Sequence, residues 1–172
     1  HPGFTLPFPL THAVFDPERP YVYVSSMDRK RVYFVNLETG FIERQFDFTL
    51  MPEHLAITPD GSRLFVALLS RQHSSQWWDG DHEGMIASFD LDLQVKDRQF
   101  SIAEDPFGLV ATSNGQLVVS SGSGQWTYIR VFDAETGTAL GADSGVRQAT
   151  RLALHPSEDV VYGADNGISP SD

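Results

Sequence analysis

Apolar residues occur along this chain in short runs, each of which ends at turn-forming residues after a few positions. No stretch keeps the 3.6-residue apolar spacing of an amphipathic helix over a dozen positions, so the pattern predicts strands and almost no helix. The most continuous runs are typical of strands that are buried on both faces. They lie at residues 13–15, 55–57, 109–111 and 152–154.

A turn follows each of these runs, and its recurrence defines a repeat. The equivalent turn positions are Pro17, Pro59, Ser113 and Pro156. Two of the turns contain Asp-Gly or Asn-Gly, at residues 60–61 and 114–115. This dipeptide is a strong hairpin signal because both of its residues tolerate positive φ. The repeat is roughly 40 to 50 residues long, with about a dozen residues inserted in one loop of the second copy.

Each copy continues with further strand-like segments. The second segments lie at 21–24, 63–67, 116–119 and 160–162, the third at 31–35, 85–89 and 128–132, and the fourth at 41–46 and 95–100. The fourth segment of the third copy, near 139–146, is weak and rich in glycine. Four antiparallel strands in a unit of this length are typical of a β-propeller blade. The sequence predicts one all-β domain with blades at residues 11–50, 53–104 and 106–147 and a truncated fourth blade at 149–172.

Three stretches resemble the repeat of the YVTN family of β-propeller proteins. They are 21–25 (YVYVS), 35–40 (VNLETG) and 55–67 (LAITPDGSRLFVA). The resemblance extends over nearly the whole chain, although the third copy has TSNG at 112–115 and lacks the proline. Similar repeats occur in cell-surface proteins, in propeller lactonases and in propeller dehydrogenase subunits. The resemblance therefore implies the fold and does not single out a function.

The predicted ring is incomplete, because propellers usually have four to eight blades. We expect the chain to be part of a seven- or eight-bladed propeller, with the remaining blades supplied by the rest of a longer chain. Other arrangements stay open: two copies that close a seven-bladed ring, a chain that persists as an open arc, or remaining blades that lie on another chain. Within residues 1–172 the strand at 160–164 would be an open edge, and such edges invite pairing with another strand.

Charge and composition narrow the classes of partner. The formal net charge is −11, with 23 acidic residues against 12 Lys and Arg, so nucleic acid and anionic membranes are not expected as partners. The chain has no cysteine, which excludes disulfides, thiol catalysis and cysteine metal sites. No apolar run approaches the ~20 residues of a membrane span. We expect an exported protein, extracellular, at the cell surface or periplasmic.

The tryptophans give the best indication of function. The long loop 70–84 contains Trp77 and Trp78, and the equivalent loop of the next blade, 122–128, contains Trp126. Loops between second and third strands lie on one face of a propeller, so all three tryptophans of the chain are expected on that face. They either pack onto a neighbouring blade or form a stacking platform for a sugar, a peptide or a partner protein.

The same long loop carries candidate metal ligands. Asp79, Asp81 and Glu83 alternate around a glycine and are able to offer oxygens to Ca²⁺ or another divalent ion, although the spacing is not that of an EF-hand. A solvated acidic turn is the alternative. His73 and His82, with an aspartate, are candidates for a transition-metal site.

A second set of candidates lies five residues before each inner turn. His12, His54 and Arg151, with Gly108 at the equivalent position of the third blade, are expected around the mouth of the central channel on the tryptophan face. The histidines either bind a metal or polar ligand or cap their strands and bind water. We expect neighbouring blades to hold them too far apart for metal binding without further ligands.

These observations favour a binding or scaffold propeller that recognises a protein or glycan partner through the loops of the tryptophan face. One alternative is a propeller enzyme, a lactonase, lyase or dehydrogenase subunit, with a metal or an acid and base at the channel mouth. Another is a structural module of a cell-surface protein. No nucleophile elbow, P-loop, dinucleotide fingerprint or zinc helix motif occurs in the sequence, and no catalytic residue is assigned.

Overall fold

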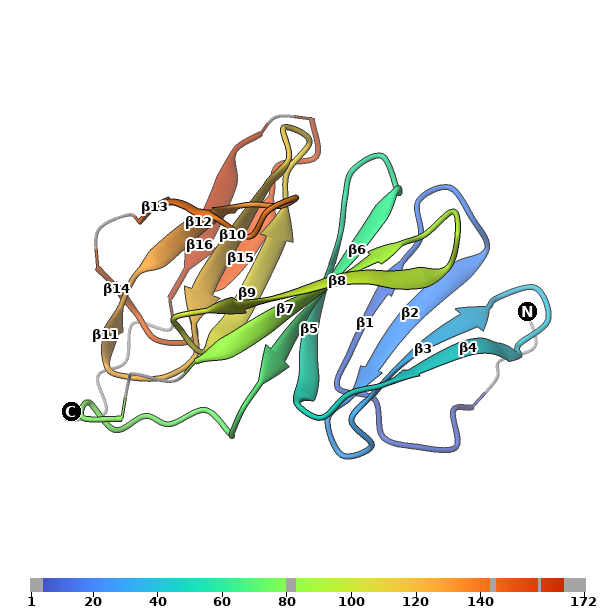
Figure 1. The fold of residues 1–172 in the computed structure, drawn as a ribbon, viewed down its shortest axis with the longest axis horizontal. Helices are drawn as coiled ribbons and strands as arrows, with labels where there is room; N and C mark the ends of the chain where they lie inside the picture. Colours follow the sequence, from blue (N-terminus) through green and yellow to red (C-terminus); the bar gives the residue numbers. More distant parts are fainter. Residues whose placement is uncertain (1–4, 80–82, 143–144, 158, 166–172) are drawn as a thin grey trace.

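Strands account for all regular structure in the part of the chain that the structure describes. This structure is a computed structural model, and it describes residues 5–79, 83–142, 145–157 and 159–165. These residues form three four-stranded antiparallel sheets and two two-stranded sheets, with no helix among them (Figure 1). The predicted all-β fold with four-stranded blades is confirmed.

The three complete blades follow one another along the chain. Blade 1 contains β1 (His12–Phe15), β2 (Tyr21–Ser26), β3 (Arg31–Asn36) and β4 (Ile42–Asp47). Blade 2 contains β5 (Met51–Ile57), β6 (Arg63–Leu69), β7 (Gly84–Asp90) and β8 (Val95–Ile102). Blade 3 contains β9 (Pro106–Ala111), β10 (Gln116–Ser121), β12 (Ile129–Asp133) and β13 (Ala139–Ala142). The strands β15 (Arg151–Leu154) and β16 (Val161–Ala164) begin a fourth blade.

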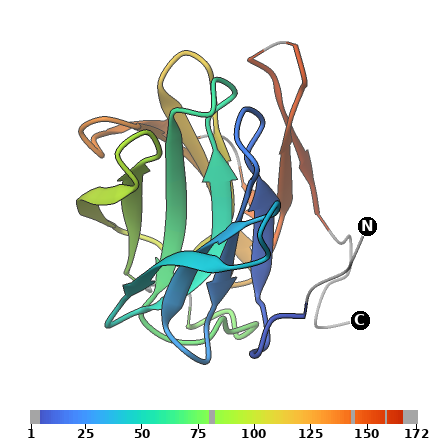
Figure 2. The same ribbon diagram turned by 90° about the vertical axis from the view of Figure 1, so that its right-hand side faces the viewer.

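The innermost strands β1, β5, β9 and β15 contact one another in that order, so the blades radiate from a common axis. Loops gather at the two opposite ends of the blades (Figures 1 and 2). We call one end the aromatic face, which carries the β2–β3 and β6–β7 loops and the loop between β10 and the short strand β11 (Trp126–Thr127), and it lies at the bottom of Figure 1. The opposite end, which carries the inner turns after β1, β5, β9 and β15, is the turn face. No helix long and apolar enough to cross a membrane occurs in the described ranges.

Two hydrophobic clusters fill the spaces between the blades. Side chains alternate between the two faces of a strand, so Tyr23 and Phe34 point from blade 1 toward blade 2, where they meet Phe89 in a fully buried aromatic group. A second cluster, which includes Phe65 and Leu117, joins blades 2 and 3. The core therefore lies between the sheets, and each blade depends on its neighbours.

The outward face of blade 1 is also covered. Val22, Tyr33 and their neighbours on this face form a third cluster with Leu6 and Phe8 of the N-terminal segment. Phe8 stacks on Tyr33, with ring centroids 4.1 Å apart. Residues 5–11 form no strand, and they shield a surface that would otherwise be apolar and exposed.

The inner turns confirm only part of the hairpin prediction. Gly61 and Gly115 have φ of +67° and +81°, as a turn with glycine at its last position requires. The residue before each glycine does not have positive φ. Each turn begins one residue earlier than the dipeptide suggests. Gly61 N donates to Thr58 O at 2.9 Å, so the second turn begins at Thr58. Pro59 fixes the φ of the second position of this turn.

One small sheet was not expected from the sequence. The strand β11 (Trp126–Thr127) pairs with β14 (Val146–Arg147) at the aromatic face, and β13 ends at Ala142. Two-residue strands have no periodic signature, so the sequence indicated one weak strand at 139–146 in their place. This sheet positions Trp126.

A candidate ligand-binding pocket on the aromatic face

The structure brings the three tryptophans together. Trp77, Trp78 and Trp126 line one pocket of about 320 Å³ on the aromatic face. Their side chains are 72%, 67% and 65% exposed, so they do not pack onto a neighbouring blade. Trp77 and Trp78 meet edge to face, with ring centroids 5.5 Å apart. Exposure of three large aromatic side chains in one place is typical of recognition sites.

The long loop reaches this pocket because it crosses from blade 2 to blade 3. It leaves β6 and extends beneath blade 3 toward β11 in Figure 1. Ser74 N donates to Ser123 Oγ at 2.9 Å, and Gly124 N donates to Ser74 O at 3.1 Å. These hydrogen bonds attach the loop to the equivalent loop of blade 3.

His73 is the main anchor of the loop. Its Nδ1 lies 2.6 Å from Asp105 Oδ2, and its Nε2 lies 2.8 Å from Glu53 Oε2. Burial by itself would lower the pKa of His73, but hydrogen bonds to Asp105 and Glu53 outweigh burial and raise the pKa to about 9. His73 is therefore an imidazolium at neutral pH that bridges a carboxylate of β5 and one just before β9.

The backbone approaches the His73 ring closely at Gly122. A Cβ atom at this position would lie 2.2 Å from His73 Nδ1, so only glycine fits. Gly122 N donates to Asp105 O at 2.9 Å, and Ser123 Oγ donates to the Asp105 carboxylate. The same short loop thus positions Asp105, the His73 ring and the start of the segment that carries Trp126.

Glu104 forms the floor of the aromatic pocket. Its side chain is 6% exposed, and Arg130 Nε lies 3.5 Å from Oε2. The other oxygen, Oε1, is buried without a hydrogen-bond partner in the described part of the chain. Burial raises the pKa of Glu104 to about 8, with Arg130 lowering it and Asp105 raising it to a smaller extent. An uncharged carboxylic acid is therefore the main form of this group at neutral pH.

Replacement of Glu104 by glutamine is expected to stabilise the protein at alkaline pH. The folded protein holds the Glu104 proton up to about pH 8, whereas the unfolded chain releases it near pH 4.5, so the wild type loses stability between these values. Glu104→Gln should match the wild type at pH 5 and exceed its free energy of unfolding by about 2 kcal/mol at pH 9. Urea unfolding at the two pH values measures this, and equal stability at pH 9 would contradict the buried, partnerless position of Glu104.

Two guanidinium groups lie over aromatic rings at the rim of this pocket. Arg147 lies 5.3 Å from the ring centroid of Trp126, and Arg130 lies 5.8 Å from that of Tyr128. Tyr128 also lines the pocket and is 51% exposed. Sequence reasoning missed Glu104, Tyr128 and Arg130, because only the fold shows that they adjoin the tryptophans.

The structure describes only some of the candidate metal ligands of the long loop. Asp79 pairs with Arg71, with Nη2 and Oδ1 2.5 Å apart, and Glu83 is exposed. Asp81 and His82 lie outside the described residues. Within the described ranges no group of three or more His, Asp or Glu is placed to hold a metal ion. Both ring nitrogens of His73 lie against carboxylates, and a transition-metal site that includes His73 and His82 stays a prediction.

The channel-mouth candidates do come together. His12 and His54 stack with ring centroids 4.0 Å apart, closer than we expected for neighbouring blades. Burial lowers the pKa of His54 to about 4 and also lowers that of His12, and Arg151 is close enough to lower both further. Leu55 N donates to His12 Nδ1 at 3.2 Å. The pair is therefore neutral at pH 7, and a ligand-binding role for these residues stays a prediction.

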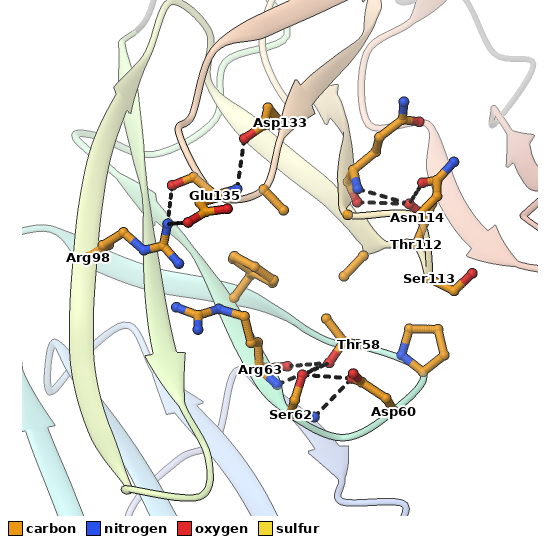
Figure 3. Close-up of a pocket in the computed structure, with 16 residues that line it drawn as sticks. Thr58, Asp60, Ser62, Arg63, Arg98, Thr112, Ser113, Asn114, Asp133 and Glu135 are labelled. Atoms are coloured by element: carbon orange, nitrogen blue, oxygen red, sulfur yellow. Dashed lines mark hydrogen bonds and ion pairs between the residues drawn. The ribbon is translucent and has the colours of Figure 1, made fainter.

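A larger pocket of about 510 Å³ opens on the turn face between blades 2 and 3 (Figure 3). Most of its polar groups are used by the protein itself. Asp60 and Asp133 accept hydrogen bonds within their own turns, and Arg98 donates to the backbone of Glu135. The buried Nε of Arg63 is an exception, because it has no hydrogen-bond partner among the described residues. This pocket serves mainly to join the two blades, and the aromatic pocket is the better candidate for ligand binding.

Comparison with known proteins supports the fold. No protein-family model matches the chain, and no curated protein sequence matches it. Among solved structures it is similar to Kuenenia stuttgartiensis hydrazine synthase, with a TM-score of 0.72 and 17% identity over 90% of this chain and 41% of that one. It is also similar to U3-55K, with a TM-score of 0.67 and 14% identity over 87% of this chain and 43% of that one.

Both of these structures contain β-propellers, and at such identities the likeness shows the fold alone. The chain spans less than half the length of either. Kinship with the YVTN family stays a prediction. The likeness and the four-stranded antiparallel blades together identify the chain as part of a β-propeller.

Proposed function

We propose that this chain is a binding module of a larger β-propeller, of the YVTN type, that recognises a protein or glycan partner through the aromatic pocket. The observation that carries the proposal is the convergence of Trp77, Trp78 and Trp126, exposed, on one pocket from loops of two blades. Exposed tryptophans cost free energy in water and are enriched where partners bind. The remaining blades would come from the rest of a longer chain or from a second copy.

The rigid support of the pocket favours binding through preorganisation. The loop that carries Trp77 and Trp78 is fixed through His73 to a carboxylate of each adjoining blade. Trp126 belongs to the small β11–β14 sheet. Aromatic groups that are already held in place lose little conformational entropy when a ligand binds, so more of the contact energy appears as affinity.

Trp126→Ala is expected to weaken partner binding at least tenfold with little change in stability. Its ring is 65% exposed, so the fold loses few contacts, whereas a ligand in the pocket loses a stacking surface. The test is to screen the wild type against an immobilised glycan array and a displayed peptide library, and then to measure the affinity of each hit for both proteins.

The matched control is Phe41→Ala, which removes an aromatic ring that is 72% exposed in the turn between β3 and β4 on the turn face. It should leave every affinity unchanged. Hits that bind wild type and Trp126→Ala equally, or the absence of any hit in both screens, would refute the proposed function.

A further inference from the structure

Three of the hydroxyl groups that line the aromatic pocket donate their protons to other groups of the protein. Ser121 Oγ donates to Ser123 O at 3.2 Å, Ser123 Oγ to the Asp105 carboxylate, and Thr127 Oγ1 to Val146 O at 3.4 Å. A hydroxyl has one proton and two lone pairs, so these groups present mainly acceptors to a ligand. A ligand that bonds to these groups therefore brings hydrogen-bond donors, whereas the indole N–H groups, Tyr128 and Arg130 can donate to acceptors on the same ligand.

Charge in and around the pocket disfavours a charged ligand of either sign. A cation would meet Arg130 and Arg147, whose guanidinium groups already lie against Tyr128 and Trp126. An anion would meet the negative faces of the aromatic rings and a chain with a net charge of −11. The pocket fits an uncharged molecule.

An uncharged molecule that has both hydrogen-bond donors and acceptors and a flat apolar face matches the lining. The exposed indole rings offer apolar, electron-rich faces on which C–H groups can stack. A proline-rich peptide also stacks on such rings, but proline has no backbone N–H to donate. A saccharide ring has an apolar face for the indoles and hydroxyl groups at its edge, which both donate and accept.

We infer that the ligand of the aromatic pocket is an uncharged saccharide that stacks on the tryptophans and hydrogen-bonds through its hydroxyl groups to Glu104. This inference rests on the proposed function and names the class of ligand. The buried Oε1 of Glu104 has no partner among the described residues, and a buried polar atom without a partner is costly. A saccharide hydroxyl at this point supplies the missing hydrogen bond.

The protonation of Glu104 agrees with this assignment. Burial raises its pKa to about 8, so at neutral pH the group carries a proton to donate as well as a carbonyl oxygen to accept. Glutamine has the same capacity and nearly the same shape, whereas leucine has neither donor nor acceptor. Glu104→Gln and Glu104→Leu thus form a matched pair for the test.

The probes are neutral hexasaccharides of glucose, mannose, xylose and N-acetylglucosamine, measured by isothermal titration calorimetry at pH 7. The charged comparators are the glucosamine hexamer, a cation, and the galacturonate hexamer, an anion; a decaproline peptide represents the peptide class. At least one neutral probe should bind with a Kd below about 1 mM, and the charged comparators and the peptide should bind at least tenfold more weakly. Glu104→Leu should weaken the neutral probe tenfold or more, and Glu104→Gln less than threefold.

The outcomes distinguish failure of the saccharide inference from failure of the proposed binding function. If only a charged comparator or decaproline binds, and Trp126→Ala abolishes it, the saccharide inference fails and the binding function stands. If no probe binds, the saccharide inference fails, and the array and peptide screens decide the binding function. If a neutral probe binds equally to wild type, Trp126→Ala and Glu104→Leu, the saccharide inference and the proposed binding function both fail. Circular dichroism confirms folding of each variant, and Glu104→Gln tests the site even if Glu104→Leu does not fold.

Discussion

Replacing Phe89 with alanine is expected to destabilise the protein by about 3–5 kcal/mol, the largest effect of any single substitution considered. Phe89 of β7 is fully buried between blades 1 and 2. Its ring centroid lies 5.6 Å from that of Phe34, 4.8 Å from that of Phe46 and 6.3 Å from that of Phe48. Removal of the ring leaves a cavity that strands fixed in two sheets are unable to close.

The free energy of unfolding in urea measures this effect. Phe89→Leu keeps most of the buried volume and should lose no more than about 2 kcal/mol, and the exposed Phe41→Ala should be close to neutral. A loss below 1 kcal/mol in Phe89→Ala would mean that the contact between blades 1 and 2 is not a main source of stability.

Replacing His73 with alanine is expected to lower the free energy of unfolding by about 3 kcal/mol at pH 7, because two carboxylates lose the cation between them. The Asp105 side chain is 2% exposed and the Glu53 side chain 19%, so water replaces the lost partner poorly. The loop that carries Trp77 and Trp78 should then separate from blade 3. Urea unfolding measures the first effect, and amide hydrogen exchange in residues 70–79 measures the second.

The dependence on pH provides an internal control. The pKa of His73 is raised from 6.5 to about 9, so its stabilising contribution is complete below pH 6.5 and is lost as the pH rises through 9. The difference between wild type and His73→Ala should shrink over this range. Gln72→Ala, an exposed neighbour in the same loop, should leave stability unchanged at both pH values. A difference that stays constant from pH 6.5 to 10 would contradict the charged bridge.

The strands of the blades could be predicted because each has its own signal. Apolar runs such as 55–57 mark innermost strands, and the turns between strands contain glycine, proline and aspartate at recognisable positions. The small β11–β14 sheet could not be predicted, because strands of two residues are determined by tertiary contacts and leave no pattern. The turn at Gly61 is an intermediate case, because the sequence predicted its position but not the φ values of its residues.

The site was predictable only where topology alone decides position. Trp77 and Trp126 lie in equivalent loops of adjacent blades, so their placement on one face follows from the repeat. Whether they pack or stay exposed depends on the anchoring of the loop through His73, whose partners lie 20 and 32 residues away in the sequence. The stacking of His12 on His54 depends in the same way on how closely adjacent inner strands approach, which no repeat pattern reveals.

The N-terminal segment that covers the outward face of blade 1 affects the order in which further blades can pack against this chain. Before a further blade could contact β2 and β3 on that side, Leu6 and Phe8 would have to be displaced and the Phe8–Tyr33 stack broken. On the opposite flank, among the described residues of the fourth blade, Tyr162 of β16 is 57% exposed. We therefore expect neighbouring blades to pack first against the fourth blade and last against the covered face of blade 1.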